Sequence, residues 1–317
     1  MPRVFHFVFG LKEQVQPFSL MHYLALRSCL EVNRPRSLHV HYQHMPWGPL
    51  WERIQPYLEL RHLPQELPLS AYDYGDRTAS EAFRYAHSSD FLRVEILNRE
   101  GGVYADMDTL FLAPYPDELY GHDFVMGHET VDPHVTYAHS GGSLCNALFF
   151  CAPGAAFATA WRREMGIAFD GHWSRHSTFL PFELSQRHPQ TIHVEPSTSF
   201  FHLDWTPEGI RDLFERNVRL PACAYSLHLW AHLWTDRKRT DVTRFHEGRL
   251  TADYIRYADT TFAHHARQWL PDDLPTKSSV AWRATQYTQA AGDGLLRSAD
   301  WLRSVAGRAA AAARRTP

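Results

Sequence analysis

The feature that most constrains this chain is an apolar segment that follows a glycine pair and ends in two closely spaced aspartates. Gly101 and Gly102 precede the apolar residues 103–105, and Asp106 and Asp108 follow two positions apart. In an extended segment such side chains project to one side. Two carboxylates this close raise each other's pKa, and Mg²⁺ or Mn²⁺ relieves the repulsion because hard oxygen ligands suit these ions. The segment therefore predicts a strand that ends at a metal site, with a simple acidic turn as the alternative.

Length and composition are those of a globular protein. A chain of 317 residues can bury one large core or two modest ones. Hydrophobic residues make up 44% and charged residues 21%, which argues against wholesale disorder. The formal net charge of −3 gives no general attraction for nucleic acid, so no nucleic-acid partner is expected.

The cysteines and the N-terminus bear on the cellular compartment. The cysteines are widely spread and form no Cys-x-x-Cys pair, which favours buried reduced thiols over disulfides or a zinc site: Cys29, Cys145, Cys151 and Cys223. The apolar run at residues 4–9 is too short for a signal peptide, and no stretch approaches the roughly 18 apolar residues of a membrane span. We therefore expect a cytoplasmic protein.

The chain opens with alternating strand-like and helix-like segments. Residues 4–9, 38–42 and 58–63 have the apolar character of strands, and residues 17–32 and 49–58 have helical spacing. This βαβαβ order predicts an α/β fold with a Rossmann-like, mostly parallel sheet flanked by helices.

A long amphipathic segment at residues 81–99 predicts the helix that leads into the aspartate segment, and the glycine pair ends it. Ligands of open α/β sheets bind beyond the carboxyl ends of strands. Asp106 and Asp108 are expected to lie at such a strand end. Further along, apolar runs predict strands at 146–150, 192–194 and 225–230 and a helix at 155–165.

The C-terminal region has a different character. Residues 271–275 are rich in proline and aspartate and predict a linker. The tail that follows is basic, and one helical face is apolar, at Leu295, Ala299, Leu302 and Ala306. A basic amphipathic helix can lie on an anionic membrane surface, so peripheral membrane contact is one expectation, and a helix packed on the domain is the other.

Six short motifs follow one another along most of the chain. They are the opening strand Phe5-His6-Phe7-Val8-Phe9, then Ser89-Asp90-x-x-Arg93, Gly101-Gly102-x-Tyr104, Asp106-x-Asp108, Asn146 before an apolar strand, and His228-Leu229-Trp230. This order resembles the DXD-motif sugar transferases, which include bacterial capsular and α-1,4-glycosyltransferases and fungal α-1,6-mannosyltransferases. It is more distantly similar to the glucosylating bacterial toxins. The chain departs from these relatives at Phe9-Gly10, where a Trp often follows the opening strand.

The resemblance implies a mixed sheet of the GT-A type, a nucleoside-diphosphate-sugar donor, a divalent metal and transfer with retention at the anomeric carbon. UDP is the favoured nucleotide, and Mn²⁺ is favoured over Mg²⁺. Asp106, Asp108 and His228 are the expected metal ligands. A metal between protein carboxylates and both phosphates acts as a Lewis acid that stabilises the leaving diphosphate.

The helix motif is expected to bind the donor. Asp90 and Arg93 share a helix face, and the resemblance implies that they grip donor hydroxyls or ribose, with Arg93 also near phosphate and Ser89 beside them. A salt bridge on a solvated face is the alternative. The remaining donor residues are expected to be Phe7 and Val8, which frame the base with backbone groups, Trp230, and Asn146, which contacts the sugar or the metal ligands. Catalysis is expected to depend on Asp90, Arg93, Asp106, Asp108 and Asn146.

The later half of the chain is expected to bind the acceptor. The expected parts are a nucleotide-sugar half at 1–120, an acceptor half of the same domain at 121–270, and a linker with a helical tail at 271–317. The acceptor is a hydroxyl of a glycan, a lipid-linked saccharide or a small metabolite. Residues that suit the acceptor cleft are Trp161, Trp173, His176, Glu183 and Trp205.

Two other functions compete with this interpretation. A metal-dependent phosphohydrolase is suggested by the 21 histidines and by His122-Asp123, although the chain has no His-Glu-x-x-His motif. A non-catalytic protein that binds sugar nucleotides or glycans is the second alternative. Because no second carboxylate stands out as a covalent nucleophile, we expect the acceptor hydroxyl to attack from the front face, with the leaving phosphate taking its proton.

Overall fold

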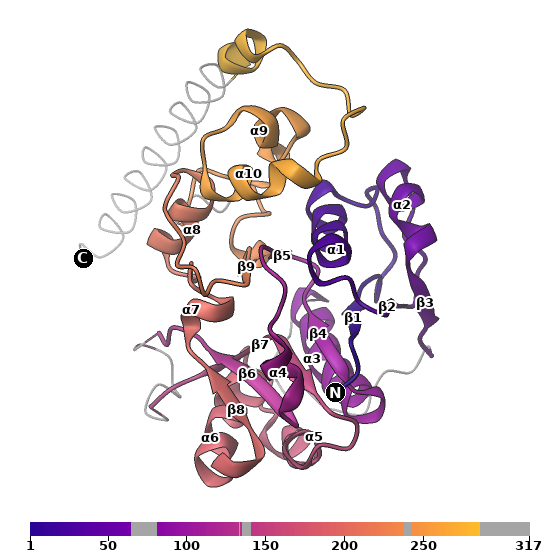
Figure 1. Cartoon of the computed structure of the whole chain (residues 1–317), viewed down its shortest axis with the longest axis vertical. Helices are drawn as coiled ribbons and strands as arrows, with labels where there is room; N and C mark the ends of the chain where they lie inside the picture. Colours follow the sequence, from indigo (N-terminus) through magenta and orange to yellow (C-terminus); the bar gives the residue numbers. More distant parts are fainter. Residues whose placement is uncertain (65–80, 133, 135–140, 238–241, 286–317) are drawn as a thin grey trace, which may run out of the picture.

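The computed structural model describes residues 1–64, 81–132, 134, 141–237 and 242–285 (Figure 1). A seven-stranded sheet forms the centre, in the order β3-β2-β1-β4-β7-β6-β8. Its strands are β1 (Val4–Val8), β2 (Ser37–Tyr42), β3 (Glu59–His62), β4 (Gly102–Ala105), β6 (Phe124–His128), β7 (Leu144–Cys151) and β8 (His193–Glu195).

The sheet is mixed. Strands β3, β2, β1 and β4 are parallel to one another, whereas β7 is antiparallel to both of its neighbours, β4 and β6. Strand β8 is parallel to β6. The prediction of a Rossmann-like α/β fold with a mixed sheet is confirmed. Among the described strands four of the six pairings are parallel, as expected of a mostly parallel sheet, and β7 is the strand that runs against its neighbours.

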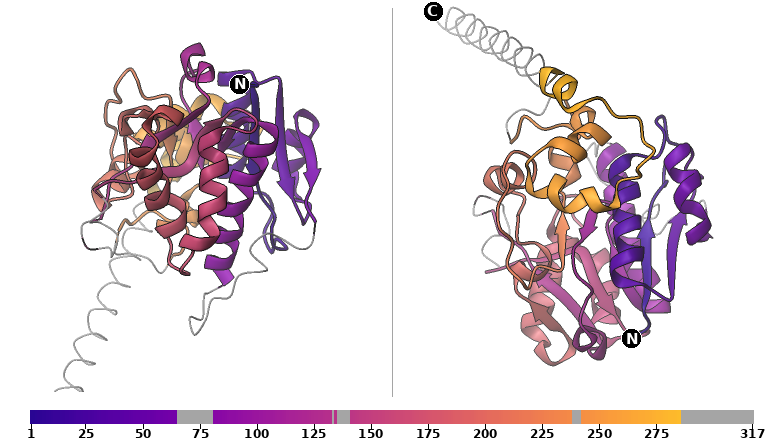
Figure 2. Two further views of the ribbon diagram at one scale, coloured as in Figure 1. Left: turned by 90° about the horizontal axis from the view of Figure 1, so that it is seen from below. Right: turned by 45° about the horizontal axis from the view of Figure 1, so that its top comes forward.

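Helices cover both faces of the sheet. Helices α1 (Leu20–Asn33) and α2 (Pro49–Ile54) lie on one face, and α3 (Glu81–Glu100), α5 (Ala156–Ala168) and α6 (Leu180–Arg187) lie side by side on the other (Figure 2). Side chains alternate between these layers along each strand, as the period of two requires. On β1, for example, Phe5 and Phe7 pack in the α1 layer and Val8 packs in the α3 layer.

A second, two-stranded sheet is separate from the seven-stranded one. The short strand β5 (Thr109–Phe111) pairs antiparallel with β9 (Ser226–His228), so that Thr109 lies opposite His228. This pairing joins segments more than one hundred residues apart and places His228 next to the aspartate segment. The other described helices are α4 (Asp117–Gly121), α7 (Ser197–Phe200), α8 (Pro207–Phe214), α9 (Ala252–Tyr257) and α10 (Thr261–Ala266).

Some local predictions were wrong. Strand β4 ends at Ala105, and Asp106 to Asp108 form a turn in which the Thr109 N–H donates to the Asp106 carbonyl at 3.0 Å. The predicted helix 49–58 is a shorter α2 followed by a 3₁₀ turn, Gln55–Tyr57. The predicted strand 225–230 ends at His228, because Trp230 has a left-handed backbone with φ of 53°. Cys223 is exposed, whereas the other three cysteines are buried free thiols as expected.

Most of the predicted tail lies outside the described residues. Leu295, Ala299, Leu302 and Ala306 are among those positions, so the membrane contact of the tail and the cytoplasmic location stay predictions. Asp273, in the predicted linker, pairs with Arg53 of α2 at 2.9 Å. In the described part of the chain, no helix has the length and apolar character needed to cross a bilayer.

Candidate functional site

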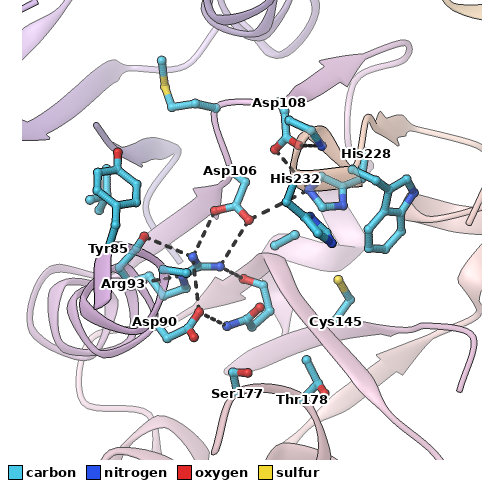
Figure 3. A pocket seen from close by; sticks show the side chains of 18 of the residues that line it. Tyr85, Asp90, Arg93, Asp106, Asp108, Cys145, Ser177, Thr178, His228 and His232 are labelled. Carbon is cyan, nitrogen blue, oxygen red and sulfur yellow. Dashed lines mark hydrogen bonds and ion pairs between the residues drawn. The ribbon is translucent and has the colours of Figure 1, made fainter. Parts of the chain in front are cut away.

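A cavity lies at one edge of the sheet, where several strands end together (Figure 3). Val8 ends β1, Asp106 follows β4, Glu129 follows β6, and Asn146 is the third residue of the antiparallel strand β7. Strand direction therefore brings the carboxyl ends of three strands and the start of a fourth to one place. Ligands of open α/β sheets bind at such an edge.

Asp106 is held by residues of α3 and β4. Its carboxylate accepts hydrogen bonds from the Tyr104 hydroxyl at 2.6 Å and from Arg93 Nη1 at 3.3 Å. The guanidinium of Arg93 also stacks over the Tyr104 ring, 4.6 Å from its centre. Burial raises the pKa of Asp106, with Asp108 adding to the rise and Arg93 opposing it.

Asp108 is held from the opposite side by the segment after β9. Its Oδ1 lies 3.1 Å from His228 Nε2, and its Oδ2 accepts the backbone N–H of Ala231 at 2.8 Å. The left-handed Trp230 turns the chain so that this N–H points at the carboxylate. Burial opposes ionisation of Asp108, but His228 and the Ala231 N–H outweigh it and lower its pKa.

The two aspartates and His228 fit a divalent cation. One ligand atom from each lies within 4.8 Å of the others. The pKa of His228 is raised despite burial, because Asp108 and Asp106 both favour its charged form. Its Nδ1 is buried without a hydrogen-bond partner. The two carboxylates provide negative charge and oxygen ligands, and the imidazole provides a nitrogen ligand. Mn²⁺ accepts both kinds of ligand.

Arg93 is enclosed by protein groups. Besides Asp106, it donates to the Asn146 carbonyl at 2.9 Å and to the Ser89 hydroxyl at 3.0 Å. Its Nε donates to the Ser89 carbonyl at 3.2 Å. Arg93 is 5% exposed, so the alternative of a salt bridge on a solvated face is wrong.

Asp90 shares this buried network. Its Oδ1 accepts the Asn146 side-chain amide at 2.7 Å and lies 3.3 Å from Arg93 Nη2, and its Oδ2 lies 3.1 Å from His176 Nε2. Burial would raise the pKa of Asp90, but Arg93 and His176 together lower it. Asp90, Asn146 and Arg93 all line the cavity, so the structure brings these predicted residues together.

The end of the cavity near β1 is aromatic. Phe9 and His22 line it with ring centres 4.5 Å apart, and Tyr85 of α3 also lines the cavity (Figure 3). Burial raises the pKa of Tyr85 to about 12 and lowers that of His22 to about 4. Val8 lines the cavity as expected, whereas the Phe7 side chain packs in the core against Phe111 and does not line it.

A second cavity adjoins the first. Both are lined by Glu129, Trp173, Thr178, Trp230 and His232. Trp205, which we expect at the acceptor cleft, lines the second cavity, and its Nε1 donates to the Thr130 carbonyl at 2.8 Å.

Three other residues expected at the acceptor cleft line neither cavity. Trp161 is fully buried and donates to the His176 carbonyl at 3.0 Å. His176 is itself buried against Asp90, and Glu183 pairs with Arg175 at 3.0 Å. Aromatic and acidic residue types are common to cores, surface ion pairs and carbohydrate sites, so residue type alone could not separate these positions.

Glu129 is a cavity residue that the sequence did not single out. It lies in the shared wall, accepts a hydrogen bond from the Ser143 hydroxyl at 2.5 Å, and has a pKa raised by burial. The only sequence signal is its position just after the apolar run Phe124–His128. Tyr85 and His232 were missed in the same way.

His122, which suggested a hydrolase, lies outside both cavities, and so does the adjacent pair His264 and His265. His122 stacks on His193 with ring centres 4.1 Å apart, and the rings of His264 and His265 contact each other at 5.2 Å. Among the described residues, neither pair belongs to a group that could hold a metal. The phosphohydrolase alternative therefore gains nothing from them.

Two curated proteins are similar to the chain. Glucan organizing enzyme 1 of Cryptococcus neoformans var. grubii is 29% identical over 239 residues, which is 73% of this chain and 63% of that protein. Subversion of eukaryotic traffic protein A of Legionella pneumophila is 37% identical over 75 residues, which is 23% of this chain and 11% of that protein. The chain thus spans less than two thirds of the length of either relative.

Solved structures with distant similarity include PaToxG glycosyltransferase, with a TM-score of 0.41 and 13% identity over 59% of this chain and 70% of that one. The glycosyltransferase GlyE of Streptococcus pneumoniae has a TM-score of 0.42 and 10% identity over 85% of this chain and 63% of that one.

A family model matches residues 29–126 and describes a glycosyltransferase sugar-binding region that contains a DXD motif. Within those residues Asp106-Met107-Asp108 is the only Asp-x-Asp triplet in the sequence, and all three of its residues line the cavity. The expected family resemblance is confirmed: residues 29–126 match the model of the glycosyltransferase sugar-binding region that contains a DXD motif.

Proposed function

We propose that this chain is a metal-dependent, retaining glycosyltransferase that moves a sugar from a nucleoside-diphosphate sugar, with UDP favoured, to an acceptor hydroxyl. The observation that carries the proposal is the convergence of Asp106, Asp108 and His228 beside a cavity at the carboxyl edge of the sheet. The matched family region, which includes both aspartates, supports it.

The metal would be held by Asp106, Asp108 and His228. When bound, it would stabilise the negative charge of the leaving diphosphate as a Lewis acid. Asp108 is fixed by the Ala231 N–H and Asp106 by Tyr104 and Arg93, so both carboxylates are oriented before a ligand arrives. The N–H groups of Arg93 donate to protein atoms. We therefore assign Arg93 a positioning role, in place of the predicted contact with the sugar nucleotide.

The nucleotide would lie toward β1, with its base among Phe9, His22 and Tyr85. Phe9 and His22 supply the aromatic surface for stacking. The donor sugar would lie near Asp90 and Asn146, where the Asp90 carboxylate can accept a hydrogen bond from a sugar hydroxyl. This arrangement draws on residues from both predicted halves of the domain.

The acceptor would enter through the second cavity. Trp173, Trp205 and Trp230 give it an aromatic wall of the kind that packs on sugar rings, which favours a saccharide-containing acceptor. Glu129 stands where the cavities meet and is placed to accept a hydrogen bond from the attacking hydroxyl.

The proposed transfer takes place on one face of the donor sugar. The acceptor oxygen forms a bond to the anomeric carbon while the bond from that carbon to the phosphate oxygen breaks. The acceptor proton passes to the departing phosphate oxygen, so retention needs no covalent enzyme intermediate. The protein's part is to hold both oxygens on the same side and to exclude water.

Thermal unfolding with UDP, GDP or CMP, each with and without Mn²⁺, tests the donor site. A ligand at a hundred times its Kd adds about 2.7 kcal/mol of stability, which gives a clear shift in Tm. We expect one nucleoside diphosphate to stabilise the protein only together with Mn²⁺, and Asp108→Asn to abolish the effect. Asp117→Asn, at an exposed carboxylate of α4, is the matched control. A protein that responds to no combination contradicts the proposal.

A further inference from the structure

A second group of metal-binding side chains lies on strands β1 and β2. In the parallel register of these strands His6 lies opposite His39, and His41 follows two residues later on the same face. The three rings meet, with centres 4.8 Å apart for His6 and His39 and 5.3 Å apart for His6 and His41. Glu100, the last residue of α3, completes the group.

The hydrogen bonds of His6 direct one ring nitrogen into this group. Its Nε2 lies 3.0 Å from the Gly101 carbonyl, which can only accept, so Nε2 carries the hydrogen. The lone pair of His6 Nδ1 then points at His41 Nε2, 3.0 Å away. Gly102 leaves room for this ring, because a Cβ at that position would lie 3.2 Å from it.

His39 directs a second lone pair to the same place. Its Nε2 lies 3.0 Å from the Ser37 hydroxyl and 3.3 Å from the Glu59 carboxylate, which places the hydrogen on Nε2. Its Nδ1 faces inward, 3.7 Å from Glu100 Oε2, and has no hydrogen-bond partner although His39 is only 6% exposed. A buried nitrogen lone pair without a donor is costly unless another group satisfies it.

We propose that His6, His39, His41 and Glu100 form a binding site for a divalent transition metal, of which Zn²⁺ is the best match. Ligand atoms from all four lie within 4.8 Å of one another. Two nitrogens on one tetrahedral zinc, each bound at about 2.0–2.1 Å, lie about 3.3–3.4 Å apart, so His6 and His41 need to move only slightly. His41 needs to carry its hydrogen on Nδ1 in place of Nε2.

The surroundings match those of metal ligands. Ligating histidines usually donate their other ring N–H to a carbonyl or carboxylate, as His6 and His39 do here. The second oxygen of Glu100 is held by Arg99 at 2.6 Å. His6 and His41 are buried, and burial favours the neutral imidazole, which is the form that binds metal.

This site is separate from the Asp106–Asp108–His228 group. Arg93, toward the middle of α3, contacts Asp106, whereas Glu100 at the end of α3 faces the histidines. None of the four residues lines either cavity. Four protein ligands without an open position are typical of structural zinc. The metal would therefore tie β1, β2 and the end of α3 together, away from the donor.

Zinc binding to an untagged protein tests the proposal. The protein is stripped with a chelator, titrated with Zn²⁺ against a chromogenic competitor, and examined by zinc X-ray absorption. The Asp108→Asn background removes the other metal site. In that background we compare His39→Gln and Glu100→Gln with His62→Gln, an exposed histidine of β3.

We expect Asp108→Asn to bind one zinc with histidine scattering and His62→Gln to leave that binding unchanged. Loss of an outer partner alone costs about 10–100-fold in affinity, so His39→Gln should weaken binding by more than about 100-fold. Glu100→Gln changes a partly exposed side chain, and it provides the test if His39→Gln does not fold. Failure of Asp108→Asn to bind zinc, or a zinc affinity that neither His39→Gln nor Glu100→Gln lowers, would overturn the proposal.

Discussion

Arg93 and Asp106 form a two-pronged ion pair that links α3 to the end of β4, with Nη2 3.2 Å from Oδ1 and Nη1 3.3 Å from Oδ2. Thirteen residues separate the two in the chain. Because Arg93 is buried and also holds Asn146 and Ser89, it fixes the first aspartate of the motif relative to both the helix and β7. The position of the Asp106 carboxylate thus depends on the packing of α3.

Arg93→Lys tests this dependence. Lysine keeps the charge but has three N–H groups and no planar fork, so it cannot satisfy Asp106, Asn146 and Ser89 together. We expect a loss of about 2–4 kcal/mol in the free energy of unfolding by urea, as for a broken buried ion-pair network. We also expect weaker Mn²⁺-dependent nucleotide binding by calorimetry. Arg163→Lys, an exposed position on α5, should change neither quantity. Wild-type stability of Arg93→Lys would show that the network does not fix Asp106.

Asp90→Asn should make stability depend less on pH. Because the folded-state pKa of Asp90 is lowered, its ionised form stabilises the protein above the unfolded pKa of about 3.9, and this contribution is lost as the pH falls through the folded value. We expect Asp90→Asn to cost about 2 kcal/mol near pH 7, since it weakens hydrogen bonds to a charged group, and less at acid pH. Unfolding measured across this range, with Asp117→Asn as control, tests it. A difference that does not change with pH contradicts the role given to the carboxylate.

Mn²⁺ binding should strengthen as the pH rises. The pKa of His228 is raised above its usual 6.5, so protons compete with the metal for this imidazole at neutral pH. We expect Mn²⁺ affinity to increase by up to about tenfold per pH unit below the His228 pKa, with release of a proton. Calorimetry in two buffers of different ionisation enthalpy measures both. His228→Gln should bind more weakly and with a flatter pH profile. An affinity of the wild type that is constant with pH would show that His228 is not a ligand.

Much of the fold could be predicted from local sequence. The helix ended by Gly101 and the buried strands of the first hundred residues have patterns that depend on near neighbours, and Gly101 ends α3 with φ of 71° and its N–H bonded to the Leu97 carbonyl. The antiparallel insertion of β7 could not be predicted in this way, because strand pairing is set by contacts distant in sequence.

The same distinction applies to the site. Asp106 and Asp108 were singled out by their spacing, which predicts that both side chains project to one side of a strand. The strand ends before them, but the turn that follows also places both carboxylates at the cavity. His228 was predicted only through the family motif. The β5–β9 pairing that places it beside the aspartates joins segments distant in sequence, so it could not be predicted from the neighbouring residues. His6 with His39 depends on a strand register in the same way, and so does the place of Glu129 in the shared wall of the cavities.

The most direct test is the release of UDP from UDP-sugars, followed by NMR with Mn²⁺ or with a chelator. Water can stand in for the acceptor, so the assay needs no knowledge of the natural one. We predict Mn²⁺-dependent release by the wild type, little release with the chelator, and a loss of at least about a hundredfold in Asp108→Asn, as for removal of a group that stabilises the transition-state charge. Full metal-dependent release by Asp108→Asn would contradict the account.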